Sequence, residues 1–379
     1  MSDELPLQSF EVHGYRGIRH LALPRLGNVN LFVGLNNAGK TSLLEAVHLY
    51  TSKTPRVVLA SILRERSGFR PRFSSDREVT AEQVTAALDT ARSLFYGTFA
   101  GSVRDPIRIG PAGGDGDALT IWLPWAATNG TGEAGDALDL ELFIEPDSPL
   151  IQMSRGENTV SVSVDWFLRR FGVMITGIQR RTSYIPAQGL DAARLGEMWD
   201  QAVEAGYAPE VEQAIRSVVP ELERIYLIGE AAAGGRSLYL QLQGTPRPMP
   251  LTSMGDGTTR VFGIALSCVR ARGGALLVDE VENGLHHTVQ PDVWQSIIGL
   301  AEQLSVQVFA TTHSWDAVVG FQFAATNSAS HGMLYRLERE ADGGIYAEQY
   351  TEKDVAVAAR AQVEVRLWAH DLGRRAAHA

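Results

Sequence analysis

The stretch "NLFVGLNNAGKTSLLEAVHLY", residues 30–50, decides the fold because a glycine-rich loop joins an apolar segment to an amphipathic one. The loop matches the P-loop pattern G-x-x-x-x-G-K-[ST] through Gly34, Gly39, Lys40 and Thr41. In such a loop, backbone N–H groups turn inward around phosphate oxygens, and the positive end of the next helix dipole faces the same anion. The stretch therefore predicts a buried strand, a phosphate-binding loop and a helix that begins near Lys40.

The side chains of this loop indicate a nucleoside triphosphate bound with Mg²⁺. We expect the Lys40 ammonium to reach the β- and γ-phosphates and the Thr41 hydroxyl to ligate the metal. A glycine-rich turn between a strand and a helix would explain neither residue. The expected phosphate-binding residues are Gly34, Asn36, Asn37, Ala38, Gly39, Lys40, Thr41 and Ser42.

Bulk composition restricts the class of protein. The chain has 379 residues, enough for one large domain or two to three smaller ones, and its 45% hydrophobic and 21% charged residues are ordinary for a soluble globular protein. No apolar run approaches the roughly 18–20 residues that cross a bilayer. The acidic N-terminus lacks the apolar core of a signal peptide, and Cys268 is the single cysteine. We expect a cytoplasmic protein.

The charge balance bears on nucleic-acid partners. A net charge of −10 argues against a chain coated in nucleic acid, although local basic patches leave DNA contact open. Such patches are Arg64, Arg66, Arg70, Arg72 and Arg77, and Arg169, Arg170, Arg180 and Arg181. We interpret both clusters as solvated or salt-bridged surface. Lysine occurs only at positions 40, 53 and 353, so a lysine is present where phosphate chemistry requires one.

A second motif, "GGALLVDEVENGLHH" at residues 273–287, supplies the acids that a P-loop needs for its metal. Such an acid usually ends a neighbouring hydrophobic strand, and residues 275–278 form a short apolar run typical of a strand buried on both faces. Asp279 would then hold Mg²⁺, and Glu280 would orient and deprotonate the attacking water as general base. The alternative is that both acids only cap a following helix.

A third segment, "SVQVFATTHSWD", begins some thirty residues after the acids. Residues 306–310 are predicted to form a strand that ends in Thr311, Thr312 and His313. A histidine just past a buried strand can sense the γ-phosphate by hydrogen bonding. A purely structural histidine is the alternative. The expected catalytic set is therefore Lys40, Glu280 and His313.

Together these residues resemble the ABC-type AAA ATPases, in the branch of RecF, the SMC proteins and the OLD (overcoming lysogenization defect) ATPases. The resemblance extends over "FEVHGYRGIRHLALPRLGNVNLFVGLNNAGKTSLLEAVHLY", with the aromatic–arginine pair Tyr15–Arg16 in its first strand. It implies an α/β P-loop NTPase fold, an ABC head with an antiparallel β lobe and a short helical lobe. It also implies ATP and Mg²⁺ as ligands, hydrolysis to ADP and phosphate, and a place for Arg16 in the nucleotide site.

The same resemblance implies further site residues and a partner. In the family, two heads dimerise head to tail and bury ATP between one P-loop and the partner's signature motif. The signature resembles "LTSMGDGTTRVFGIAL", although Met254 and Asp256 depart from the common L-S-G-G-Q pattern, and "ENGLHH" resembles the D-loop. A Q-loop glutamine that ligates the metal would be Gln188, with Gln179 as the alternative. The signature residues are Ser253, Gly255, Asp256 and Gly257.

The expected organisation is an ATPase core interrupted by two lobes. We assign residues 1–52 and 230–345 to the core, 53–180 to an inserted β-rich lobe, 185–229 to a helical lobe and 346–379 to a C-terminal helical segment. "GMLYRLER" and "GIYAEQY" are predicted to form a hairpin. The sequence has no sustained heptad pattern, so a coiled-coil rod is not expected. No glutamate followed by an Asp-x-Asp cluster is found after His313, so a TOPRIM nuclease domain is not expected.

Three functions remain open at this stage. The first is an ATP-hydrolysing head that dimerises around Mg-ATP and regulates a separate effector, a nuclease or toxin, as in the bacterial antiphage systems that standalone heads of this sort resemble. The second is a RecF-like ATPase that binds duplex DNA in repair. The third is a nucleotide-bound scaffold with little turnover, which the acid pair at 279–280 argues against because a scaffold needs no general base.

Overall fold

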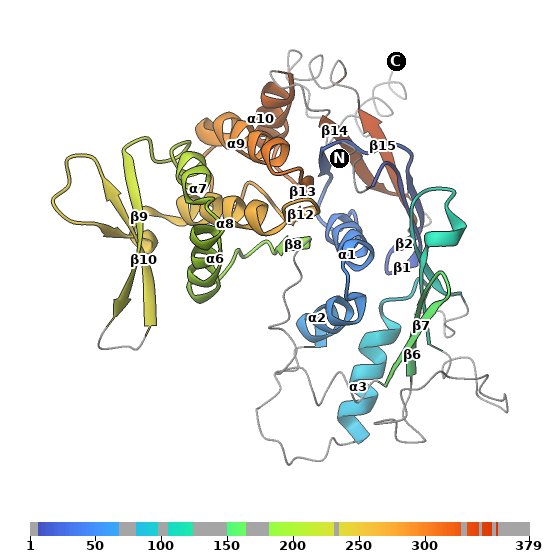
Figure 1. The fold of residues 1–379 in the computed structure, drawn as a ribbon. Coiled ribbons are helices and arrows are strands. Elements are labelled where there is room, and N and C mark those ends of the chain that lie inside the picture. The colour runs from blue at the N-terminus through green and yellow to red at the C-terminus, as the bar shows by residue number, and fades with distance from the viewer. Residues whose placement is uncertain are drawn as a thin grey trace.

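The computed structural model describes residues 7–67, 81–97, 105–123, 150–163, 182–230, 235–326, 332–340, 343–350 and 354. Over these residues the chain forms an α/β structure with a central mixed sheet (Figure 1). No helix in this described part is both long enough and apolar enough to cross a membrane. The predicted α/β P-loop fold is confirmed.

The central sheet has six strands in the order β15-β14-β3-β13-β12-β8. Neighbours from β8 to β14 pair in parallel, and β15 pairs antiparallel with β14, which confirms the predicted hairpin. The strands are β3 (Val29–Val33), β8 (Thr182–Ile185), β12 (Ala275–Val278), β13 (Gln307–Thr312), β14 (Gly332–Arg339) and β15 (Ile345–Tyr350).

Strands β3, β12 and β13 are buried along their whole length because both faces of the sheet are covered. Successive side chains alternate between the faces, so that Leu31 points into one core and Phe32 into the other. The second core contains α1 (Lys40–Thr51), which directly follows the P-loop. The first core contains α8 (Asp256–Arg270) and α9 (Gln290–Gln303). The P-loop helix and the helix after the signature segment therefore cover opposite faces.

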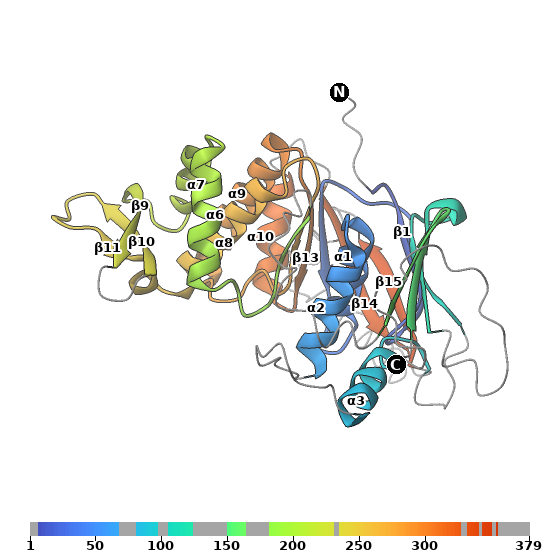
Figure 2. The same cartoon turned by 60° about the horizontal axis from the view of Figure 1, so that its bottom comes forward.

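A second sheet packs on the α1 side (Figure 2), and the described strands follow the antiparallel order β2-β1-β4-β5-β6-β7. Its first hairpin comes from the N-terminal motif, and the rest comes from the expected insertion. The strands are β1 (Phe10–Tyr15), β2 (Ile18–Leu23), β4 (Ile107–Gly110), β5 (Leu119–Trp122), β6 (Leu150–Arg155) and β7 (Asn158–Ser163). The accompanying helical elements are α2 (Pro55–Ser67), α3 (Ala81–Arg92) and η2 (Asp115–Asp117).

The other face of the central sheet carries the remaining helices and a small sheet in the order β11-β10-β9. In Figure 1 this sheet lies at the far end of the helical lobe. The helices are α6 (Ala192–Glu204), α7 (Ala208–Ile215), α8, α9 and α10 (Trp315–Thr326), with the short helices η3 (Leu251–Met254) and η4 (His287–Val289). The strands are β9 (Leu222–Glu230), β10 (Gly235–Leu242) and β11 (Met249–Pro250).

Three sequence expectations need correction. Residues 222–230 are strand rather than helix, because the alternating apolar side chains of "LERIYLIGE" pair with β10. The segment expected to be β-rich begins with α2 and α3, whose apolar residues recur at helical spacing. Residues 346–350 extend β15 and are not helical. The predicted strand "ALDLELFIE", the residues after 354, Gln179 and most of the two arginine clusters lie outside the described residues.

Glu45 on α1 joins the N-terminal hairpin to two helices. The Tyr15 hydroxyl donates to Glu45 Oε2 at 2.9 Å, and Arg16 Nη1 donates to the same oxygen at 2.8 Å. Arg66 of α2 donates to Glu45 Oε1. The Glu45 side chain is 10% exposed, so its charge is compensated by these donors rather than by water.

We predict that Glu45→Ala lowers the free energy of unfolding by about 2–4 kcal/mol, because it leaves two arginines and a buried hydroxyl without their acceptor. Urea unfolding measures this as a lower midpoint with unchanged slope. Asp89→Ala is the control, since its pair with Arg92 is exposed, and it should change stability by less than about 0.5 kcal/mol. Equal midpoints for Glu45→Ala and the wild type would contradict this role.

Candidate nucleotide and catalytic site

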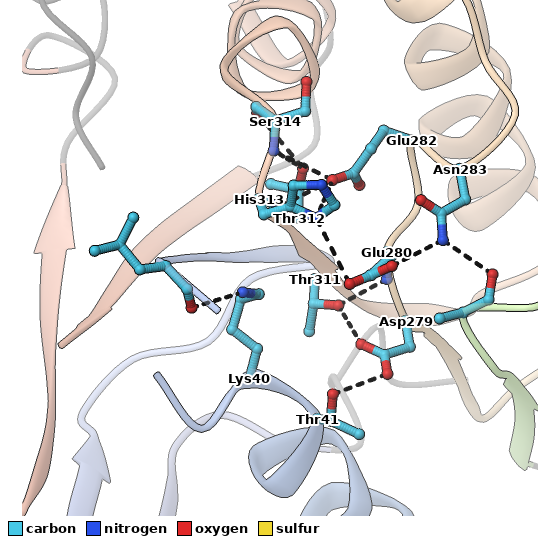
Figure 3. A network of polar contacts seen from close by, with 12 residues as sticks. Lys40, Thr41, Asp279, Glu280, Glu282, Asn283, Thr311, Thr312, His313 and Ser314 are labelled. Carbon is cyan, nitrogen blue, oxygen red and sulfur yellow. Dashed lines mark hydrogen bonds and ion pairs between the residues drawn. The ribbon is translucent and has the colours of Figure 1, made fainter. Parts of the chain in front are cut away.

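The candidate site lies at the carboxyl edge of the central sheet, where three strands end at the same level. Val278 pairs with Ala310, and Thr312 pairs with Val33. The loops that follow β3, β12 and β13 therefore meet at one edge, the usual ligand position in parallel sheets. One expectation is corrected here, because β13 lies between the P-loop strand and the acidic strand, which are not neighbours. Figure 3 shows the side chains that converge at this edge.

The P-loop backbone forms a cradle around the Lys40 ammonium. Asn37 and Gly39 have positive φ angles of 65° and 91°, and alternation of left- and right-handed residues turns successive N–H groups to one side. Lys40 Nζ donates to the carbonyls of Gly34 at 2.8 Å and Leu35 at 3.0 Å. Burial lowers the pKa of Lys40, while nearby carboxylates act in the opposite direction. The ammonium is thus held inside the loop that it is expected to share with phosphate.

Asp279 is held by two threonine hydroxyls, one at the start of α1 and one on β13. Thr41 Oγ1 donates to its Oδ2 at 2.9 Å, and Thr311 Oγ1 donates to its Oδ1 at 2.5 Å. The carboxylate is 4% exposed. These contacts bring the P-loop and the acidic strand together across β13, through a residue that β13 itself supplies (Figure 3).

Glu280 has an unusual backbone that its neighbours fix. Its φ of +49° is left-handed, a conformation that costs about 1–3 kcal/mol in a non-glycine residue. Its N–H donates to Thr311 Oγ1 at 2.8 Å, and Asn283 Nδ2 donates to its Oε2 at 2.8 Å. The side chain keeps 32% of its surface exposed. Glu280 is therefore oriented by fixed partners while its carboxylate stays accessible.

His313 lies between two carboxylates. Its Nδ1 is 3.1 Å from Glu282 Oε1 and 3.6 Å from Glu280 Oε1. Glu282 Oε1 also accepts from the backbone N–H groups of His313 at 2.8 Å and Ser314 at 3.2 Å. Glu282, 9% exposed, thus anchors the loop after β13, and that loop positions the imidazole beside the expected general base.

Arg260, on α8, fixes the backbone of the acid pair. Its Nη2 donates to the backbone carbonyls of Asp279 and Glu280. Its Nη1 donates to the Pro186 carbonyl at 2.8 Å. Burial lowers the pKa of this guanidinium, and the residue is 5% exposed. The helix that follows the signature segment is thereby bonded directly to the strand ends that carry the acids.

The signature residues lie at the start of α8 and contact the loop after the acids. Gly257 packs so closely on this loop that a Cβ there would come within 2.6 Å of the Gly284 oxygen. Ser253, Gly255 and Asp256 are exposed. α8 and α1 belong to different cores on opposite faces of the sheet, so the chain does not pack its own signature helix against its P-loop helix.

Gln188 and Arg16 also occupy defined places. Gln188 lines a cavity of about 200 Å³ with Asp256, Thr259 and Asn283. Asn283 links this cavity to the site, because it donates to the Ala187 carbonyl at 3.0 Å as well as to Glu280. None of the described hydrogen bonds joins Gln188 to Thr41 or Asp279. Arg16 donates to Glu45, and its part in nucleotide binding stays a prediction.

The donor set at the site fits Mg²⁺ and a triphosphate. The Thr41 hydroxyl and the Asp279 carboxylate are hard oxygen ligands that lie 2.9 Å apart. Asp279, Glu280 and Glu282 provide three carboxylates against two cations, the Lys40 ammonium and the Arg260 guanidinium, so the edge keeps a negative charge that a divalent cation would attract. The backbone cradle of the P-loop supplies N–H groups for phosphate oxygens.

The sequence matches known families over two segments. Residues 142–320 match the model of the family described as "AAA domain, putative AbiEii toxin, Type IV TA system". Residues 5–58 match a family described as a protein of unknown function (DUF2813). The chain is 42% identical over 60 residues to the uncharacterized protein MJECL10 of Methanocaldococcus jannaschii, covering 16% of the chain and 27% of the relative. It is 48% identical over 46 residues to the DNA replication and repair protein RecF of Thioalkalivibrio sulfidiphilus, covering 12% of the chain and 13% of RecF.

Solved structures with a similar arrangement are SMC heads. An SMC head bound to the C-winged helix domain of ScpA aligns with a TM-score of 0.48 at 10% identity, covering 91% of this chain and 97% of that one. The SMC head domain from Thermotoga maritima aligns with a TM-score of 0.40 at 12% identity, covering 91% and 99%.

The P-loop, the acid pair at the sheet edge, the AAA family match over residues 142–320 and the local identity to RecF are features that the chain shares with ABC-type AAA ATPases of the RecF/SMC branch, and together they support that assignment. The matched segments span only 27% and 13% of the two relatives' lengths.

Four residues of the site were not recognised from the sequence. The sequence places Thr311 only at the end of a strand, places Glu282 and Asn283 only within the D-loop segment, and gives Arg260 no role. Glu282 and Asn283 stand in the segment "ENGLHH", so their proximity to Glu280 was a usable signal. The sequence held no signal for the role of Arg260, because its partners are backbone carbonyls, which every residue type has.

We predict that Arg260→Met lowers the free energy of unfolding by about 2–4 kcal/mol, because three carbonyls lose their donor in a buried place. Urea unfolding measures the change. Arg272→Met is the control, because that exposed guanidinium contacts only the Tyr207 side chain among the described hydrogen bonds, and it should have a much smaller effect. Equal losses in the two variants would contradict the structural role of Arg260.

Proposed function

We propose that the protein binds and hydrolyses Mg-ATP, that two heads close head to tail around the nucleotide, and that closure regulates a separate effector, a nuclease or toxin, in bacterial antiphage defence. The observation that carries the first part is the hydrogen bond from Thr41 to Asp279 at 2.9 Å. It places the metal-binding hydroxyl of the P-loop on the acid of a strand far away in the sequence.

Binding follows from the residues at the sheet edge. Lys40 exchanges its contacts with the Gly34 and Leu35 carbonyls for phosphate oxygens, and the loop N–H groups surround the same anion. Thr41 and Asp279 hold Mg²⁺, which when bound neutralises charge on the phosphates. Asn36, Asn37, Ala38, Gly39 and Ser42 complete the phosphate-binding loop.

Hydrolysis is assigned to Glu280 with His313. Glu280 takes a proton from the attacking water while the water oxygen bonds to the γ-phosphorus. The bond between the γ-phosphorus and the bridging oxygen breaks, which gives ADP and phosphate. Its left-handed backbone and its hydrogen bond from Asn283 hold the carboxylate in one orientation. His313, 3.6 Å from Glu280, is placed to contact the γ-phosphate.

Head-to-tail closure is supported by the positions of the two anion cradles. The signature residues are exposed at the start of α8, on the face of the sheet opposite to α1. Ser253 and the N–H groups of residues 255–257 would therefore complete the site of a second copy rather than their own. Arg260 then connects that signature to the acids of its own site.

Control of an effector rests on the family. The matched family's description names a putative toxin of a type IV toxin–antitoxin system, and one SMC head was solved with a domain of ScpA. These are properties of those proteins. We extend from them only the idea that a head of this class acts together with another protein, here a nuclease or toxin.

We predict that Glu280→Gln lowers ATP turnover by about 10²-fold or more while ATP binding persists, because the amide cannot accept the proton. The trapped nucleotide should raise the dimer fraction, measured by light scattering with and without ATP. Lys40→Ala should abolish ATP binding and leave the protein monomeric under the same conditions. Glu204→Gln, the same change on an exposed helix end, is the control and should hydrolyse ATP like the wild type.

Wild-type turnover in Glu280→Gln would contradict the assignment of the general base. Normal binding by Lys40→Ala would contradict the nucleotide site. If Glu280→Gln lost turnover but formed no ATP-dependent dimer, the assignment of Glu280 as general base would stand and head-to-tail closure would be contradicted.

A second candidate function is a RecF-like head that binds duplex DNA, favoured by the 48% identity to RecF over 46 residues. It predicts ATP-dependent DNA affinity that falls steeply between low and high salt, because phosphate contacts release counterions. The effector proposal predicts no such affinity for this chain alone, consistent with its net charge of −10. An ATP titration of fluorescent duplex DNA at two salt concentrations separates the two.

A further inference from the structure

We propose that the β1–β2 hairpin binds a divalent transition-metal ion through Glu11, His13 and His20. These side chains lie on the outer face of the second sheet, away from the nucleotide site. One potential ligand atom from each lies within 4.8 Å of the others. Among the described residues, no other group of three or more His, Cys, Asp or Glu side chains meets this condition.

The strand register explains why the three groups meet. Glu11 and His13 are two residues apart on β1, so they share a face, and His20 is the direct cross-strand partner of His13. The apolar residues between them, Val12 and Leu21, point into the core. This fixed register, rather than chance contact of mobile side chains, holds two imidazoles and one carboxylate together.

The distances suit a shared ion better than direct hydrogen bonds. His13 Nε2 lies 3.6 Å from Glu11 Oε1, and His20 Nε2 lies 3.9 Å from Glu11 Oε2. Both separations exceed ordinary hydrogen-bond length. Two donor atoms on one tetrahedral Zn²⁺, each about 2.0–2.2 Å from the metal, are roughly 3.3 Å apart. Because one ligand atom of each side chain lies within 4.8 Å of the others, rotation about the side-chain bonds, with no movement of the backbone, is what the ion would require.

The two imidazole rings are also stacked, with centroids 4.1 Å apart and planes 10° from parallel. Two protonated rings at that distance repel each other. An imidazole nitrogen binds a metal in the plane of its own ring, so two parallel stacked rings cannot share an ion in this arrangement. One ring must turn out of the stack when the ion binds, and the cross-strand register keeps that ring within reach of the other two ligands.

The neighbouring positions leave space above the carboxylate. On either side of Glu11 the sheet carries Ala22 and Gly110, which have little or no side chain. On the other side of His13 lies Arg108 of β4, the one charged residue that directly pairs with the cluster in the described register. The ligand side chains are 25% to 53% exposed, so an ion and its remaining water ligands have access.

The ligand set selects the class of metal. Two imidazole nitrogens and one carboxylate suit Zn²⁺, Co²⁺, Ni²⁺ or Cu²⁺, whereas Mg²⁺ and Ca²⁺ prefer an all-oxygen shell. Three protein ligands leave a position for water. The site is therefore chemically distinct from the oxygen site at Thr41 and Asp279, and a large excess of Mg²⁺ should not fill it.

The position of the site gives the ion a structural consequence. His13 and His20 lie on the two strands of a hairpin in which β1 ends at Tyr15 and the turn begins with Arg16. Both Tyr15 and Arg16 bind Glu45 on the P-loop helix. An ion that links β1 to β2 would brace this hairpin against α1. Because it binds only the folded hairpin, it should raise the unfolding temperature by linkage.

The test is a calorimetric titration of the full chain with Zn²⁺ in excess Mg²⁺ and without nucleotide, followed by Co²⁺ absorption spectra. We expect about one Zn²⁺ per chain, a higher unfolding temperature with Zn²⁺, and the visible bands of Co²⁺ bound in a low-coordination site. His13→Gln, His20→Gln and Glu11→Gln should each weaken binding by at least about tenfold and abolish the thermal shift. Circular dichroism checks that each exposed-face variant folds.

His286→Gln is the matched control, because the His286 and His287 rings have centroids 4.1 Å apart but, among the described residues, belong to no group of three potential metal ligands. It should bind Zn²⁺ like the wild type. Wild-type affinity in the His13→Gln/His20→Gln double variant, or no Zn²⁺ binding by the wild type, would overturn the proposal. Failure of the ATPase tests would leave this result unaffected, since the two sites share no residue.

Discussion

The hydrogen bond between Thr41 and Asp279 is the contact on which the rest of the site depends. It joins residues 238 positions apart, and it exists only because β3, β13 and β12 are parallel and end at the same level. Thr311, on β13 between β3 and β12, donates a hydrogen bond to the other carboxylate oxygen of Asp279. The acid is thus held from both sides, by a hydroxyl at the start of α1 and by a hydroxyl of β13. Any change in strand order or register would separate the phosphate loop from its acid.

A second constraint acts on the backbone of the acids. Glu280 occupies a left-handed conformation, and Arg260 holds its carbonyl together with that of Asp279. Such strain persists only where surrounding contacts over-determine it, and it clusters at functional sites. Because Arg260 belongs to the helix that begins at the signature residues, a movement of that helix would reach the acids through a single buried side chain. In the proposed head-to-tail closure, this arrangement would give contact at the signature residues a direct physical route to the acids.

The sequence predicted the parts of the molecule that depend on local pattern. The P-loop spacing located the start of α1, and continuous apolar runs located β3, β12 and β13, because strands buried on both faces read as such. It also predicted that Asp279 and Glu280 lie near the phosphate loop, as metal ligand and general base. Local pattern failed at the end of the segment 185–229, which was assigned to a helical lobe but ends in strand β9, and at α2 and α3, which were not foreseen.

What the sequence did not predict depends on contacts between distant residues. The place of β13 between the two motif strands is a property of the sheet order, which residue types do not encode directly. Arg260 looked like any helical arginine, since its acceptors are backbone oxygens. The cluster of Glu11, His13 and His20 likewise appeared only when the cross-strand register paired the histidines.

The most direct test of the central claim is a structure of Glu280→Gln crystallised with Mg-ATP. The account predicts the γ-phosphate between Lys40 and residue 280 of one chain, Mg²⁺ on Thr41 and Asp279, and Ser253 of the partner subunit on the far side of the nucleotide. A nucleotide bound away from the Thr41–Asp279 contact would contradict the account.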